Sequence, residues 1–162
     1  MTAPLPRSPA ASLHTDILLI EGNPLEAELT LKPIRELDPH CGIDVARDGE
    51  EALDFLFGRG AFQHRAGAPI PRLILLDLKL PRLGGLEVLR AIRANSRTCT
   101  AVVVVLTASD DPREVSQCYQ VGANSCVEKP VRYEELRATL QTIGRYWLGL
   151  NQSPSAPALP GA

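Results

Sequence analysis

The segment RLILLDLKLP, residues 72–81, decides the fold. Its apolar residues run without a break from Leu73 to Leu76, which is typical of a strand buried on both faces of a parallel sheet. The run ends in the carboxylate of Asp77, and an acid adds nothing to an apolar core. Open α/β sheets bind their ligands at the carboxyl ends of their strands. Asp77 is therefore the leading candidate for a functional residue.

Strand-like runs alternate with segments of helical periodicity along the chain. This alternation predicts an α/β fold in which a doubly wound parallel sheet carries helices on both faces. The expected strands are residues 16–20, 42–46, 73–77, 101–106 and 124–128.

The first expected helix has the clearest start signal, with Asn23 as N-cap and Pro24 at the first helical position. Pro33 lies further along and lacks a backbone donor, so we expect the helix to kink or end early there. The residues expected on its inward side are Leu25, Leu29 and Ile34.

The second and third helices are expected at about 50–57 and 85–94. The fourth is expected to start at Pro112 and to end in a left-handed cap at Gly122. The last helix is expected to include Trp147 near its end. Asp111 is the expected N-cap of the fourth. The segment 58–71 is longer than most connections, and we expect a surface loop, with partner contact as the alternative. The inward positions are Leu86, Leu89 and Ile92 in the third helix and Leu136, Leu140, Ile143 and Trp147 in the last.

Length and composition limit the possible functions. A chain of 162 residues suits one domain, here residues 15–150, between two tails rich in Pro, Ala and Ser (1–14 and 151–162) that we expect to be disordered. A net charge of -2 without a dense basic run argues against a nucleic-acid partner. The apolar runs are too short for a membrane helix, and residues 1–14 lack a secretory signal, so we expect a cytoplasmic protein.

Four cysteines are scattered without a metal-binding spacing: Cys41, Cys99, Cys118 and Cys126. We interpret them as reduced, mostly buried thiols, with zinc ligation or disulfides as the weaker alternative.

Two other expected strands end in reactive groups, Thr107 and Lys129. Each alone is commonplace, and an acid at a strand end is usually a solvated terminus. Together they place an acid, a hydroxyl and an ammonium at one edge of the sheet. A carboxylate can attack phosphorus when the phosphoryl oxygens are neutralised, and an ammonium, a hydroxyl and a bound Mg²⁺ would do this.

Asp77, Thr107 and Lys129, with the LP and GG pairs after Asp77, resemble the receiver domain of two-component response regulators over residues 16–148. The resemblance implies a flavodoxin-like (βα)5 fold with strand order 2-1-3-4-5. It implies that Asp77 accepts a phosphoryl group from the phosphohistidine of a sensor histidine kinase. Such a protein promotes only its own phosphorylation and dephosphorylation, so it is not an enzyme acting on a separate substrate.

The same resemblance assigns the remaining site residues. Thr107, Ala108 and Lys129 would bind the phosphoryl group, and the peptide bond before Pro130 would be cis. Mg²⁺ would be held by Glu21, Asp77 and the backbone carbonyl of Lys79. Lys79 and Ser109 border the expected path of the hydrolytic water.

The sequence departs from the receiver pattern at two positions. Receivers carry two adjacent acids after the first strand, and here Glu21 is followed by Gly22. We expect Glu21 or an extra water to take the vacant ligand position and the metal affinity to fall. Cys126 stands where many receivers have a switch Tyr or Phe, and a thiol is too small to report a movement of Thr107 in the same way.

Within the family, the long 58–71 connection, the LLDLKLP run and the GRYWL tail look most like the stand-alone regulators of bacterial phytochrome kinases. This likeness implies a phytochrome kinase as partner and a homodimer through the last helix. The tail residues could instead pack on a frayed helix end. The candidate dimer residues are Tyr146, Trp147, Leu148 and Leu150.

Two other classes of protein remain as alternatives. Gly22 and Cys126 favour a pseudo-receiver, an interaction module with weakened metal-dependent phosphorylation. A flavin-binding or hydrolytic α/β protein has little support, because no G-x-S-x-G, P-loop or G-x-G-x-x-G pattern is present.

Overall fold

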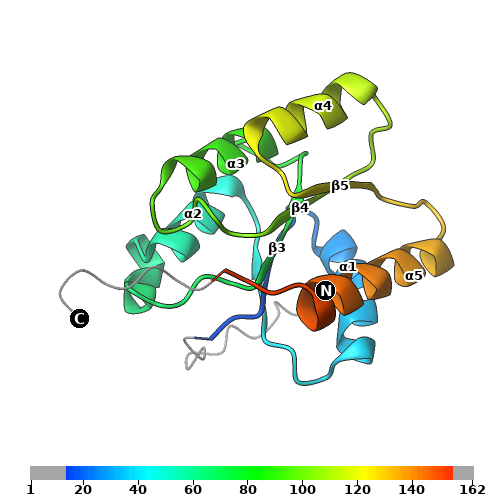
Figure 1. Cartoon of the computed structure of the whole chain (residues 1–162), viewed down its shortest axis with the longest axis horizontal. Coiled ribbons are helices and arrows are strands. Elements are labelled where there is room, and N and C mark those ends of the chain that lie inside the picture. Colours follow the sequence, from blue (N-terminus) through cyan, green and yellow to red (C-terminus); the bar gives the residue numbers. More distant parts are fainter. Residues whose placement is uncertain (1–13, 155–162) are drawn as a thin grey trace.

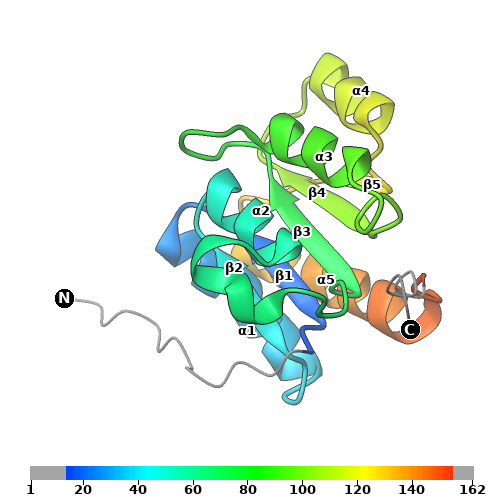
Figure 2. The ribbon, with the colours of Figure 1, turned by 90° about the vertical axis from the view of Figure 1, so that its left-hand side faces the viewer.

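The computed structural model describes residues 14–154. Its five strands form one parallel sheet in the order β2-β1-β3-β4-β5, which confirms the expected doubly wound α/β fold (Figures 1 and 2). The fourth strand starts at 103 rather than 101, although Ala101 and Val102 are buried ahead of it. The strands are β1 (Ile17–Ile20), β2 (Ile43–Ala46), β3 (Leu73–Asp77), β4 (Val103–Thr107) and β5 (Ser125–Glu128).

The continuous apolar run of β3 is divided between two hydrophobic cores. Successive side chains of a strand point to opposite faces, so Leu73 and Leu75 join one core and Ile74 and Leu76 the other. All four are fully buried. An uninterrupted apolar strand is therefore what a sheet covered on both faces requires.

Helices cover the two faces unequally (Figures 1 and 2). One face carries α1 (Pro24–Leu37) and α5 (Tyr133–Gly144), which pack against each other. The other carries α2 (Gly49–Phe57), α3 (Gly85–Ala94) and α4 (Pro112–Val121) in a row. The expected caps Asn23, Asp111 and Gly122 are present, with φ 116° at Gly122.

The first helix differs from its sequence-based expectation in two ways. It does not end early at Pro33 but continues to Leu37, because a proline removes only one intrahelical hydrogen bond while Pro33 and its neighbour Ile34 are buried. Leu25 and Leu29 are exposed, at 69% and 37%, rather than inward. The buried stripe runs instead through Ala27, Thr30, Leu31, Pro33 and Ile34.

The connection after α2 is more ordered than a plain surface loop. It contains a 3₁₀ segment, η1 (Gly60–Arg65), that packs against α2. The Arg65 guanidinium is buried 3.8 Å from the ring centre of Phe55, and its Nη1 donates to the Thr15 hydroxyl. A cation–π contact and a hydrogen bond thus give this connection a fixed place on the core.

The chain after α5 continues in a π-helical segment, η2 (Arg145–Leu150). Trp147 and Leu148 pack against the core on the α1–α5 face, and Arg72 donates to the Leu148 carbonyl. Tyr146 and Leu150 remain exposed. Within residues 14–154 no helix has the length and apolar character to cross a membrane. The expected tails lie mostly outside the described residues.

Candidate functional site

The residues singled out in the sequence come from four neighbouring strand ends. Asp77 is the last residue of β3 and Thr107 the last of β4, while Glu21 and Lys129 directly follow β1 and β5. The register pairs Ile20 with Leu76, so Glu21 and Asp77 leave the sheet side by side. The Lys129 N–H donates to the Thr107 carbonyl at 2.7 Å, which brings the lysine to the same edge.

Lys129 is the centre of the charged groups at this edge. Its Nζ lies 3.1 Å from Glu21 Oε2 and 3.6 Å from Asp77 Oδ2. Its side chain is only 13% exposed, so the ammonium is held mainly by carboxylates rather than by water. The acid and the ammonium predicted from separate strands therefore lie within ion-pair distance.

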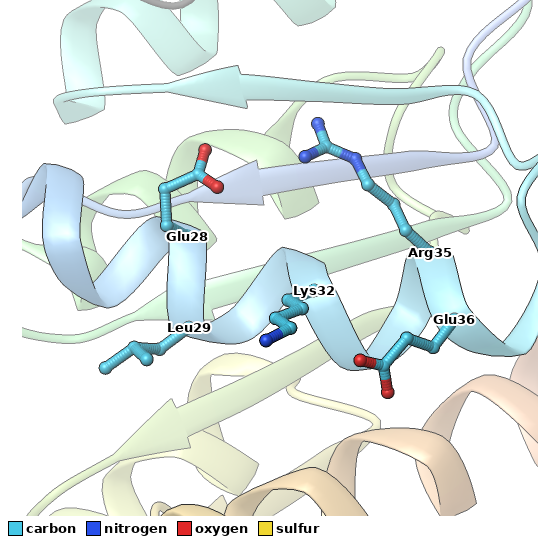
Figure 3. A pocket seen from close by; sticks show the side chains of 5 residues that line it. All are labelled: Glu28, Leu29, Lys32, Arg35 and Glu36. Carbon is cyan, nitrogen blue, oxygen red and sulfur yellow. The ribbon is translucent and has the colours of Figure 1, made fainter. Parts of the chain in front are cut away.

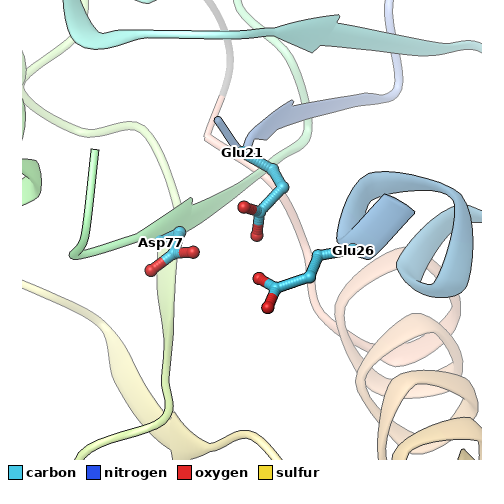
Figure 4. Close-up of side chains that lie close together, drawn as sticks. All are labelled: Glu21, Glu26 and Asp77. Carbon is cyan, nitrogen blue, oxygen red and sulfur yellow. The ribbon is translucent and has the colours of Figure 1, made fainter. Parts of the chain in front are cut away.

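A third acid, Glu26, was not predicted from the sequence. It lies in the first turn of α1, and its Oε2 is 3.3 Å from Lys129 Nζ. Figure 4 shows the side chains of Glu21, Glu26 and Asp77 converging from three elements, with oxygens within 4.8 Å of one another. The Asn23 cap already placed Glu26 in the first turn of this helix, near the end of the first strand. Acids in a first helical turn commonly only stabilise the helix dipole, so this position alone did not indicate a site.

Burial and like charge strongly perturb the ionisation of these groups. Burial, reinforced by a hydrogen bond and repulsion from Asp77, raises the pKa of Glu21 to about 7, although the Asn23 N–H and Lys129 favour its charged form. Burial lowers the pKa of Lys129, but attraction from Glu21, Asp77 and Glu26 outweighs it and the net pKa is raised. The lysine therefore stays charged, while Glu21 keeps its proton to a higher pH than an ordinary glutamic acid does.

Thr107 does not join this ionic group. Its hydroxyl, which is almost fully buried, accepts a hydrogen bond from the Ser109 N–H at 3.0 Å. Ser109 Oγ in turn accepts from the Asp111 N–H at 3.2 Å, and Ala108 between them is exposed. The hydroxyl therefore serves the turn after β4, at the same sheet edge as Asp77.

The loop after β3 is tied to Asp77 at two points. The exposed Lys79 donates its N–H to Asp77 Oδ1 at 3.0 Å. A Cβ at Gly85 would lie 2.6 Å from the Asp77 carbonyl oxygen, so only glycine lets α3 begin this close. The expected cis bond before Pro130 is wrong, because residues 14–154 contain no cis peptide bond.

The half-buried Cys126 packs against a second thiol, that of Cys118. Burial, with Cys126 beside it, raises the pKa of the fully buried Cys118 to about 12, and burial also raises the pKa of Cys126. The Cys126 N–H donates to the Tyr119 hydroxyl at 3.2 Å. All four cysteines are free, as expected, but only Cys118 is buried: Cys41 and Cys126 are half-buried and Cys99 is exposed, so the expectation of mostly buried thiols is wrong.

A surface hollow on α1 contains none of the predicted site residues (Figure 3). Every residue that lines it belongs to this one helix, so it is a gap between exposed side chains rather than a site built by several elements. Its lining is Glu28, Leu29, Lys32, Arg35 and Glu36.

Comparison with known proteins agrees with this geometry. Residues 17–141 match the family described as response regulator receiver domain. The probable methanogenesis regulatory protein FilR2 of Methanothrix harundinacea is 38% identical over 85% of this chain and 86% of its own length.

Two solved structures of cyanobacterial regulators share the fold. The phosphorylated phytochrome response regulator RcpA has a TM-score of 0.81 at 29% identity, covering 88% of this chain and 99% of that one. The Mn²⁺-bound response regulator Rcp1, a protein of Synechocystis, has a TM-score of 0.76 at 31% identity, covering 86% of this chain and 98% of that one. With its five-stranded sheet, its strand-end Asp77 and Lys129 and these relatives, the chain belongs to the receiver domain family of response regulators.

Proposed function

We propose that Asp77 is the phosphoacceptor of this receiver domain and takes its phosphoryl group from a sensor histidine kinase. The observation that carries the proposal is the placement of Asp77 at the end of β3 with the Lys129 ammonium 3.6 Å from Oδ2. Asp77 is 9% exposed, so it is reachable at the edge of the sheet but surrounded mostly by protein.

The transfer needs little from the protein beyond positioning and charge. An Asp77 carboxylate oxygen forms the new bond to phosphorus, and the phosphorus–nitrogen bond of the kinase phosphohistidine breaks, leaving its electron pair on the imidazole. Lys129 stabilises charge on the phosphoryl oxygens. Thr107 Oγ and the Ala108 N–H are available as further donors once the turn after β4 adjusts.

The donor set suits a divalent cation. Mg²⁺ prefers carboxylate and carbonyl oxygens, and Glu21 and Asp77 offer carboxylates at one sheet edge. The Lys79 carbonyl, two residues after Asp77, is the proposed third ligand. A bound Mg²⁺ would neutralise phosphoryl charge as the carboxylate approaches. Among residues 14–154, Lys129 is the only cation that forms ion pairs with the clustered acids.

The same residues would govern loss of the phosphoryl group. Lys79 is exposed in the loop that follows Asp77. Ser109 is half-buried, and its N–H bonds to the Thr107 hydroxyl. Both border the approach of water to an Asp77 phosphate. We therefore propose that the chain promotes its own phosphorylation and dephosphorylation and acts on no other substrate.

A phytochrome kinase is the partner that the relatives favour, since RcpA is a phytochrome response regulator. Homodimerisation is proposed through the segment after α5, where Tyr146 is 48% and Leu150 is 76% exposed. Trp147 and Leu148 are partly occupied by intramolecular packing, so they would contribute less. Sedimentation at about tens of micromolar tests the dimer, and a monomer alone would exclude it.

The phosphoacceptor is tested with acetyl phosphate and Mg²⁺, followed by intact mass measurement. We expect one phosphoryl adduct on the wild type and none on Asp77→Asn, which keeps the side-chain shape but is not a nucleophile. Absence of an adduct on the wild type would favour a pseudo-receiver that works by protein interaction alone.

A further inference from the structure

Gly22 occupies the position of the second acid of other receivers, and the structure leaves little room for a side chain there. A Cβ on Gly22 would lie 2.9 Å from Pro81 Cδ and 3.3 Å from the Arg47 carbonyl oxygen. Any side chain at this position would therefore push the loop after Asp77 or the end of β2. The carboxylate missing from position 22 must come from elsewhere if the site is to keep its charge.

Glu26 brings a carboxylate into the same space from a different element. Asn23 fixes the start of α1 by accepting hydrogen bonds from the Leu25 and Glu26 N–H groups, at 2.9 and 3.3 Å. The first turn of the helix thus directs Glu26 toward Glu21 and Asp77, as Figure 4 shows. Its neighbour Glu28 belongs to the separate hollow of Figure 3.

The contacts of Lys129 show that this space already attracts a cation. Its Nζ lies 3.1 Å from Glu21, 3.3 Å from Glu26 and 3.6 Å from Asp77. Three carboxylic acids face a single ammonium here, and a divalent cation would supply further positive charge to the group. Glu26 is 49% exposed, whereas Glu21 is nearly buried, so a hydrated ion would reach the group from the Glu26 side.

We propose that Glu26 supplies the metal-ligand carboxylate that Gly22 cannot, so that the divalent cation of this receiver is held by the ends of β1 and β3 and the first turn of α1. The proposal rests on the proposed function, because it concerns the metal used in phosphorylation of Asp77. It replaces the sequence-based expectation that Glu21 or an extra water fills the vacant position. With Glu26 as a ligand, the glycine at position 22 does not have to lower the affinity for the metal.

The test measures metal binding directly in the full chain. Mn²⁺ is titrated against wild type, Glu26→Gln and Glu28→Gln, and free Mn²⁺ is followed by electron paramagnetic resonance. Glu28→Gln is the matched control, since it removes the same charge from an exposed position on the same helix, outside the acid group. We expect Glu26→Gln to weaken binding about tenfold and Glu28→Gln to change it by less than about twofold.

Equal affinities of the two variants would overturn the proposal, as would a wild type that binds no Mn²⁺. Phosphorylation of the wild type by acetyl phosphate distinguishes failure of the Glu26 proposal from failure of the proposed phosphoacceptor function. If the adduct forms while Glu26→Gln binds the metal like Glu28→Gln, only the role of Glu26 is lost. If no adduct forms at saturating Mg²⁺, the phosphoacceptor role of Asp77 fails.

Discussion

Asp77 has two differently built sides. On the acid side, Glu21, Glu26 and Lys129 form one group of interdependent charges, partly excluded from water. On the hydroxyl side, the Thr107 hydroxyl accepts one hydrogen bond within its own turn, from the Ser109 N–H at 3.0 Å. Charge–charge interactions, which act over several ångströms, connect the groups on the acid side. The hydroxyl side depends on a hydrogen bond, which needs direct contact.

This difference suggests how the protein departs from other receivers. On the acid side, Glu26 offers a carboxylate where Gly22 has none. On the hydroxyl side, the Cys126 thiol lies against that of Cys118, and its N–H donates to the Tyr119 hydroxyl. Position 126 has no aromatic side chain that could follow a movement of Thr107. We therefore expect phosphorylation to depend strongly on the acid side, and the hydroxyl side to tolerate change better.

The largest expected effect separates the two sides directly. Lys129→Ala should slow formation of the Asp77 phosphate about 100-fold, because a unit charge beside the phosphoryl oxygens is lost. Thr107→Ala should slow it only about tenfold, because one neutral donor is lost. Time courses of the adduct by intact mass would measure both. A larger loss in Thr107→Ala than in Lys129→Ala would reverse the comparison.

The next largest effect is expected from a substitution in the loop between Asp77 and α3. Gly85→Ala places a Cβ 2.6 Å from the Asp77 carbonyl oxygen and from Leu78 Cα, so we expect a loss of about 1–3 kcal/mol in the free energy of unfolding. Gly84→Ala is the matched control, because nothing lies within 4 Å of its Cβ position. Urea unfolding measures both variants. Equal stabilities would mean that the loop does not depend on this close approach.

A smaller effect concerns pH. The pKa of Glu21 is raised to about 7 in the folded protein, from 4.5 as its ordinary value, so between these values the folded state binds more protons than the unfolded state. The metal-free protein should therefore lose stability, on the order of 1 kcal/mol, as pH rises from about 4.5 to 7.

Glu21→Gln isolates that contribution, since the amide has no proton to release in this range. Urea unfolding in chelator across this pH range would give the two stability curves. We expect the wild type to lose more stability than the variant as pH rises, and parallel curves would contradict the raised pKa.

The smallest expected effect lies at the exposed edge of the site. Lys79→Ala should shorten the lifetime of the Asp77 phosphate about two- to fivefold, because a side chain bordering the path of water is removed and its exposed charge is largely screened. Decay of the adduct after removal of acetyl phosphate provides the measurement. Lys32→Ala, exposed on α1, is the control, and decay as slow as in that control would exclude the role of Lys79.

Local patterns in the sequence were sufficient for most of the fold. The unbroken apolar run before Asp77 indicated a doubly covered sheet, and Asn23, Asp111 and Gly122 marked helix ends correctly, since caps depend on the backbone nearby. The predicted inward side of α1 was wrong at Leu25 and Leu29, which are exposed, and right at the buried Ile34. Which face of a helix is buried depends on its partners, here the sheet and α5.

The sequence by itself determined that Asp77, Thr107 and Lys129 lie at the ends of successive strands and meet at one edge, because parallel strands bring their carboxyl ends together. Only the tertiary structure decided that Glu26 joins Glu21 and Asp77, and that Gly22 has Pro81 against it. Strand periodicity is local and repeats along the chain. The meeting of a helix turn with two strand ends depends on how α1 packs across the sheet, and through-space electrostatics then couples residues that sequence separation keeps apart.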